Sequence, residues 1–207
     1  YIKKSLHAAS LMGADIIVIH CGSAAKISRD EAMRLASDTL WKALEETDGA
    51  EYCGIKLGIE TMGKRNQLGT LDEVLELCAL DERLCPVVDF GHMYARENGS
   101  IFGEDDTDGY MRVFSAIDEK LGADKAQNLH CHFSRIEYTG AGEKKHVTFA
   151  ENNGFGPDYK PLIKIIALEG LTPRIICESS GTMAEDAREM QDYYTVIQGD
   201  EGCAGRT

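Results

Sequence analysis

The stretch Val87–His92, with the sequence VVDFGH, decides how the chain is expected to fold. Two β-branched residues lead into an acid and a glycine, and a histidine lies three positions beyond the acid. A buried parallel strand ends in this way when polar residues stand where its backbone leaves the sheet. The stretch therefore predicts a buried strand whose carboxyl end carries chemistry.

Four other stretches share this pattern of an apolar run that ends in a side chain able to bind a metal. They end at His20, Glu60, His132 and Glu178. Between these strands lie segments with helical spacing of apolar residues, so strands and helices alternate along the chain. The expected strands are 16–20, 55–60, 86–89, 128–133 and 174–178, and the expected helices are 1–13, 28–46, 71–80, 108–121, 158–169 and 182–197.

This alternation predicts an α/β protein with a parallel sheet and helices outside it. Ligand-type residues at the carboxyl ends of strands are typical of both (β/α) barrels and doubly wound sheets. About five βα units are present, whereas a closed (β/α)8 TIM barrel needs eight, and the chain opens on a helix. We expect one domain over residues 1–207, a partial barrel that lacks its N-terminal units. Residues 96–109 and 134–157 are expected to be loops, and the length of the second indicates a functional role.

Composition narrows the class of protein. The chain has 207 residues and a formal net charge of −13, so bulk charge does not favour general nucleic-acid binding. Its seven cysteines are scattered and form no CxxC pair, which predicts reduced thiols and a cytoplasmic location. No apolar run approaches the roughly 20 residues of a membrane span, and no signal peptide is evident. We expect a monomer without membrane contact.

The candidate metal ligands combine imidazoles and carboxylates without cysteine. They are His20, Glu60, Asp89, His92, His132, His146 and Glu178. Such a set suits zinc, manganese or iron in a catalytic site, and its size indicates more than one ion. Each residue alone could be a core histidine, a helix cap or a solvated acid. Together, however, acids at one sheet edge would repel each other without cations. His130, two residues before His132, is expected to support the ligands from behind.

The motifs together resemble the endonuclease IV family of zinc-dependent apurinic/apyrimidinic endonucleases, within the xylose-isomerase-like TIM-barrel superfamily. The resemblance spans most of the chain in the family's order. The matching stretches are Ile19–Ser23, Gly58–Thr61, Val88–His92, His132–Ser134, Lys145–His146 and Ile176–Ser179.

The resemblance implies two or three Zn²⁺ ions, with Mn²⁺ as an alternative, and DNA with abasic sites as the partner. Glu60 would bridge two ions and His20 would bind the first, while Asp89, His132 and Glu178 would complete the second. His92 and His146 would hold a third. A metal-activated hydroxide would cleave the phosphodiester 5′ to the abasic site, with Glu60 and Glu178 as catalytic residues.

Two departures from the family pattern affect these expectations. The family has an aspartate two residues before the histidine that matches His146, whereas this chain has Lys144 there with Glu143 beside it. A charged lysine cannot bind a metal ion, so the third ion is expected to be weakened. The family's first three βα units, which carry a further histidine ligand, have no counterpart in the chain.

Two other functions stay open at this point. A sugar isomerase or epimerase of the same superfamily would use Glu60, Asp89, His132 and Glu178 around one Mn-like ion and act on a small sugar. A binding protein could also keep the barrel without catalysis. The mouth further carries basic residues that could form a rim for a phosphate backbone, or could be scattered and solvated. They are Lys64, Arg65, Arg96, Arg135, Lys144 and Lys145.

Overall fold

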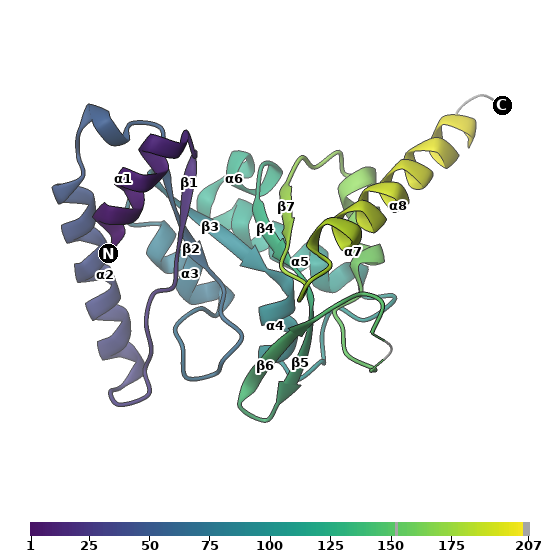
Figure 1. The fold of residues 1–207 in the computed structure, drawn as a ribbon, viewed down its shortest axis with the longest axis horizontal. Coiled ribbons are helices and arrows are strands. Elements are labelled where there is room, and N and C mark those ends of the chain that lie inside the picture. Colours follow the sequence, from purple (N-terminus) through teal and green to yellow (C-terminus); the bar gives the residue numbers. More distant parts are fainter. Residues whose placement is uncertain (152, 205–207) are drawn as a thin grey trace.

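The five predicted strands form one parallel sheet in the computed structural model, which describes the backbone of residues 1–151 and 153–204. The sheet curls into a half-barrel, consistent with a TIM barrel, and its strands run in the order β1-β2-β3-β4-β7 (Figure 1). The strands are β1 (Ile16–Ile19), β2 (Lys56–Glu60), β3 (Leu84–Asp89), β4 (His130–Phe133) and β7 (Arg174–Cys177). The prediction of an α/β fold with a parallel sheet is confirmed.

Helices cover the outer face of this sheet (Figure 1). They are α1 (Ile2–Met12), α2 (Arg29–Glu46), α3 (Leu71–Cys78), α5 (Thr107–Leu121), α6 (Ala123–Gln127), α7 (Tyr159–Leu168) and α8 (Met183–Ala204), and a 3₁₀ turn spans Ala50–Tyr52. Side chains cap the start of two of these helices: the Ser28 side chain accepts from the backbone N–H of Glu31, and Thr70 forms a capping box with Glu73. On α2, Ala36, Leu40 and Leu44 are buried, whereas Leu35 is 43% exposed.

Two stretches outside the expected helices and strands contain regular structure. Helix α4 (Phe90–Arg96) begins directly after β3, because Asp89 caps it by accepting from the backbone N–H of His92 at 2.8 Å. The stretch 134–157 was predicted to be irregular, but it contains an antiparallel hairpin of β5 (Arg135–Thr139) and β6 (Gly142–Val147). The hairpin packs beside α4 (Figure 1). Helix α8 also continues to residue 204, beyond the expected end at residue 197.

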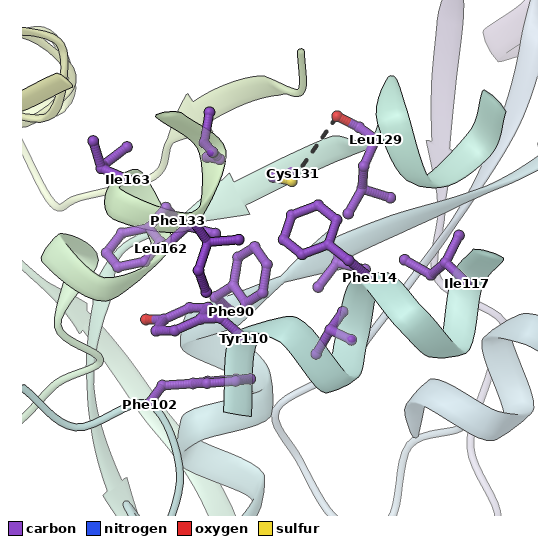
Figure 2. Packing of buried hydrophobic residues seen from close by; sticks show 14 of the residues in the cluster. Phe90, Phe102, Tyr110, Phe114, Ile117, Leu129, Cys131, Phe133, Leu162 and Ile163 are labelled. Atoms are coloured by element: carbon purple, nitrogen blue, oxygen red, sulfur yellow. Dashed lines mark hydrogen bonds between the residues drawn. The ribbon is translucent and has the colours of Figure 1, made fainter. Parts of the chain in front are cut away.

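An aromatic core lies behind the sheet at the level of the strand ends (Figure 2). Phe90 packs against Tyr110 with ring centroids 5.1 Å apart and lies 6.4 Å from the ring of Phe133. Successive strand residues point to opposite faces, so Asp89 and His132 face the barrel interior while the residues that follow them enter this core. The core therefore fixes the strand ends from which the ligands project.

The two outer strands of the sheet are tied together at their amino ends. The Arg174 guanidinium at the start of β7 bonds both carboxylate oxygens of Asp15, just before β1, at 2.7 and 2.8 Å. Because β1 and β7 are the first and last strands in the sheet order, this ion pair spans the open side of the half-barrel at its base. None of the helices in the described residues is both long and apolar enough to cross a membrane.

Candidate metal centre

Four of the predicted ligands meet at the carboxyl ends of neighbouring strands. The ligand atoms of Glu60, Asp89, His132 and Glu178 all lie within 4.8 Å of one another. Glu60 is 2% exposed and Asp89 0%, whereas the Glu178 side chain is 38% exposed. The first group, as we name these four residues, thus has a closed base and one carboxylate open to the mouth.

The first group fits a divalent cation. The Asp89 Oδ2 atom is buried and has no hydrogen-bond partner among the described residues, although it lies 3.4 Å from His92 Nδ1. A buried carboxylate oxygen without a donor is unfavourable unless a positive charge compensates it. Three carboxylates around one imidazole form a donor set suited to ions such as zinc or manganese. Both observations indicate a metal site.

Glu60 connects two histidines through its two oxygens. His132 Nδ1 donates to Glu60 Oε1 at 2.7 Å, and His20 Nε2 lies 2.7 Å from Glu60 Oε2. Burial alone would raise the pKa of Glu60, but the hydrogen bonds from His132 and His20 outweigh it and lower the pKa to about 2. The same hydrogen bond raises the pKa of His20. Glu60 is therefore an anion at neutral pH, and His20 reaches the centre through it.

A second group lies beside the first and consists of His92, Glu143 and His146. Glu143 Oε2 is 3.6 Å from His92 Nε2, and Glu143 Oε1 is 3.9 Å from His146 Nε2. The other ring nitrogens are engaged: His92 Nδ1 donates to the Thr61 carbonyl oxygen at 2.9 Å, and His146 Nδ1 bonds the Ser134 hydroxyl at 2.7 Å. Such outer partners orient imidazoles that bind metal, so both Nε2 atoms face Glu143.

A bulge in β6 brings Glu143 and His146 to the same face of the hairpin. Tyr138 pairs with Glu143, but Glu137 pairs with Lys145, so Lys144 is an extra residue without a partner in the register. In a regular strand, residues three apart point to opposite faces, and one extra residue restores them to the same face. Lys144 and Lys145 both bond Glu137 on the other side of the hairpin. Lys144 consequently does not occupy the ligand position.

Glu143 is thus the site residue that sequence reasoning did not assign. The expectation that Lys144 weakens this group took the sequence position two before His146 as the ligand position. The sequence did contain a signal for a hairpin. Gly140 and Gly142 lie close together between two stretches with strand character, as glycines do in a hairpin turn. Recognising the hairpin would still have left the bulge undetermined.

The predicted basic rim is mostly occupied by contacts within the protein. Arg96 and Arg135 donate to backbone carbonyl groups, Arg65 donates to the Arg96 carbonyl, and the two lysines of β6 bond Glu137. The buried Arg96 and the half-buried Arg135 saturate carbonyls that would otherwise lack donors, whereas Arg65 is exposed. These five side chains thus bond groups within the protein, which disfavours a free phosphate-binding rim among the two alternatives.

His130 lies one layer below the first group. Its ring is 5.3 Å from that of His132, its Nε2 atom is buried without a hydrogen-bond partner among the described residues, and burial lowers its pKa to about 4. A neutral imidazole packed against His132 supports that ligand from behind, which is the place that the sequence indicated for it.

Comparison with known proteins finds a matching barrel family and two relatives. The family model described as "Xylose isomerase-like TIM barrel" matches residues 1–195. The chain is 29% identical over 163 residues to the uncharacterized protein MJ0133 of Methanocaldococcus jannaschii, covering 79% of the chain and 57% of that protein. It is 28% identical over 182 residues to a probable endonuclease 4 of Acholeplasma laidlawii, covering 85% of the chain and 58% of that protein. The chain thus spans less than two thirds of the length of both relatives.

Solved structures agree in fold. A D-tagatose 3-epimerase-like protein superposes with a TM-score of 0.64 at 19% identity, over 96% of this chain and 68% of that one. The IOLI protein with a bound zinc atom superposes with a TM-score of 0.56 at 14% identity, over 96% of this chain and 66% of that one. At these identities the likeness concerns the fold alone.

Proposed function

The chain belongs to the xylose isomerase-like TIM-barrel family, and from this premise we propose that it is a metal-dependent hydrolase that cleaves DNA 5′ to abasic sites. The observation that carries the proposal is the presence of two adjacent ligand groups. His92 joins them, since its Nδ1 is 3.4 Å from Asp89 Oδ2 while its Nε2 faces Glu143. Two neighbouring ions suit phosphodiester cleavage, whereas a sugar isomerase needs one group only. The similarity to a probable endonuclease 4 supports the same reading.

The residues of the chain have distinct roles in this proposal. Bound divalent ions would supply Lewis acidity and neutralise charge on the phosphodiester. Glu60, anionic and held by two histidines, links His20 to the first group. Glu178 is the carboxylate open to the mouth, so its oxygens are placed to accept the proton of the attacking water. The Ser134 hydroxyl holds the His146 ring in place.

The test is the nicking of a duplex oligonucleotide with one abasic site by the full natural protein, with bound metal quantified in the same sample. Glu178→Gln removes the proposed proton acceptor. Glu185→Gln is the matched control, because Glu185 is an exposed acid in the first turn of α8. We expect cleavage 5′ to the site, lost in Glu178→Gln and kept in Glu185→Gln, with at least two ions bound. One bound ion without cleavage excludes this function.

The second candidate is a sugar isomerase or epimerase that uses a single ion. The first group alone supplies the three carboxylates and one imidazole that it needs, and the inward-turned arginines leave less charge for a DNA backbone. Its carboxylates would move a proton next to a polarised carbonyl. Incubation with ketoses in D₂O tests it, because isomerisation or epimerisation incorporates deuterium at the carbon beside the carbonyl.

A further inference from the structure

The loop between β2 and α3, residues 62–67, turns its backbone carbonyl groups toward the protein. Arg96 donates hydrogen bonds to four of these carbonyl groups. Its Nη1 donates at 2.9 Å each to the carbonyl oxygens of Met62 and Lys64, and its Nη2 donates at 3.2 Å each to those of Arg65 and Gln67. One planar guanidinium thus sits inside the curve of the loop and fixes four of its peptide groups.

The two remaining carbonyls and a second arginine complete this arrangement. The Ser23 hydroxyl donates to the carbonyl oxygen of Asn66 at 2.8 Å, and the backbone N–H of Glu143 donates to that of Gly63 at 3.1 Å. Arg29 adds bonds to the Arg65 and Gln67 carbonyls at 3.2 and 2.9 Å. All six carbonyls of residues 62–67 therefore accept hydrogen bonds from the protein.

Arg96 has this loop as its main partner. It is 8% exposed, and no carboxylate among the described residues forms an ion pair with it. Only carbonyl dipoles compensate the charge of this buried guanidinium, so its burial is favourable only if the carbonyl groups keep their positions. The loop in turn keeps its conformation only if the guanidinium bonds these carbonyl groups. Lysine at this position could not bond four carbonyls at once, since it offers three donors from a single point.

Lys64 is exposed, and its backbone pairs with Gly142, the residue before Glu143 of the second group. Its neighbour Gly63 is so close that a Cβ there would lie 2.6 Å from Glu143 Cβ and 3.1 Å from His92 Cδ2. The Lys64 ammonium forms no hydrogen bond or ion pair with any described residue. Of the six basic residues expected at the mouth, Lys64 is the one whose side chain makes neither a hydrogen bond nor an ion pair within the described residues, whereas the exposed Arg65 donates through its Nε to the Arg96 carbonyl.

We propose that Lys64 binds an anionic phosphate group of the substrate, and that Arg96 is the positioning residue that holds Lys64 beside the second group. The inference rests on the proposed function for the site's substrate class. It adds Lys64 as the residue that binds the phosphate and Arg96 as the residue that positions Lys64. A fixed loop binds better than a flexible one, because less conformational freedom is lost on binding.

The first test measures equilibrium binding of a fluorescent duplex with a tetrahydrofuran abasic analogue at several salt concentrations, in the Glu178→Gln background so that no turnover interferes. We expect Lys64→Gln to weaken binding about tenfold and to lower the salt slope by about one, as loss of one phosphate contact does. Lys144→Gln is the control, since that ammonium is already paired with Glu137. Equal affinity and slope in Lys64→Gln and Lys144→Gln overturn the proposal.

The role of Arg96 is read from a double-mutant cycle. Arg96→Lys keeps the charge but not the four bonds, and its folding is checked by thermal unfolding. If Arg96 acts through Lys64, the double variant binds no more weakly than Lys64→Gln alone, so the two effects are not additive. A purely structural role predicts additive losses, which would overturn the positioning role.

Inorganic phosphate as a second probe separates this inference from the proposed function. If the natural protein fails to nick abasic DNA but binds phosphate more tightly than Lys64→Gln does, the endonuclease function is wrong and Lys64 stands as a phosphate contact for a smaller substrate. If neither the duplex nor phosphate binds in a Lys64-dependent way, the inference is wrong whatever the nicking assay shows.

Discussion

Gly63 occupies a position where any side chain would collide with the second ligand group. A Cβ at this position would lie 3.0 Å from Glu143 Oε2, besides its overlap with the Cβ of the same residue. Glycine is therefore required here by close approach rather than by its backbone angles. Because residue 63 has no side chain, the backbone of loop 62–67 can pack directly against Glu143 and His92 of the second group.

Gly63→Ala is expected to displace Glu143 and to release the ion of the second group, while the first group keeps its ion. Metal stoichiometry after dialysis measures this as a loss of about one ion per chain. Gly103→Ala is the control, because a Cβ at Gly103 meets no atom within 4 Å. An unchanged stoichiometry in Gly63→Ala would contradict the assignment of Glu143 as a ligand.

At the scale of single elements, the first turn of α3 carries a carboxylate with several partners. Burial would raise the pKa of Glu73, but bonds from Arg29 and from the backbone N–H groups of Gly69 and Thr70 outweigh it and lower the pKa to about 2. Because the pKa is lower in the folded state than the usual 4.5, the stabilisation is present above about pH 4.5. It is lost as the pH falls toward 2.

Glu73→Gln is expected to lower the free energy of unfolding at pH 7 by roughly 2 kcal/mol, allowing for the partial exposure of Arg29, and to lower it less at pH 3. Urea unfolding at several pH values with a chelator present measures this difference. Glu76→Gln, an exposed acid on the same helix, should change little at either pH. A deficit in Glu73→Gln that stays constant with pH would show that the carboxylate charge is not the cause.

The bulge at Lys144 makes a prediction about chain length. Deleting Lys144 removes only the unpaired residue, so β6 becomes regular and Glu143 and His146, then two apart, still share a face. The second ion should remain bound. Deleting both Lys144 and Lys145 makes the two ligands adjacent and opposite, and the ion should be lost. Metal stoichiometry distinguishes the two deletions, and equal ion content in both would refute the bulge as the cause.

Sequence reasoning located what depends on local pattern and missed what depends on distant partners. The strand ends at Glu60, Asp89, His132 and Glu178 could be predicted, since an apolar run followed by a polar residue is visible within a few positions. The inward turn of Arg96 could not be, because its carbonyl partners lie about thirty residues away. Helix α4 and the hairpin were not predicted, because each is short and its cap or turn is determined by a few residues only.

For the whole molecule, acids from β2, β3 and the end of β7 converge, so we expect the stability of the fold to depend on bound cations. Removing the metal with a chelator leaves the carboxylates of the first group close together without a compensating charge. Their repulsion should lower the Tm. An ion present at a thousand times its Kd adds about 4 kcal/mol, which corresponds to roughly 10 °C for a domain of this size. Differential scanning fluorimetry with added zinc or with chelator measures this shift.

Asp89→Asn is the informative variant for that shift. It removes one buried charge and weakens ion binding, so the difference in Tm between the zinc-loaded and the chelated protein should shrink. If the unsubstituted protein has the same Tm in zinc and in chelator, the first group binds no ion that stabilises the fold.

The ion pair between Asp15 and Arg174 joins residues 159 positions apart. A contact of such separation carries a large loop-closure entropy, so it forms late in folding. During synthesis, β1 leaves the ribosome long before its ionic partner exists, and Glu178 follows that partner by only four residues. The base of the half-barrel and its first ligand group are therefore completed at nearly the same moment, when the final strand has emerged.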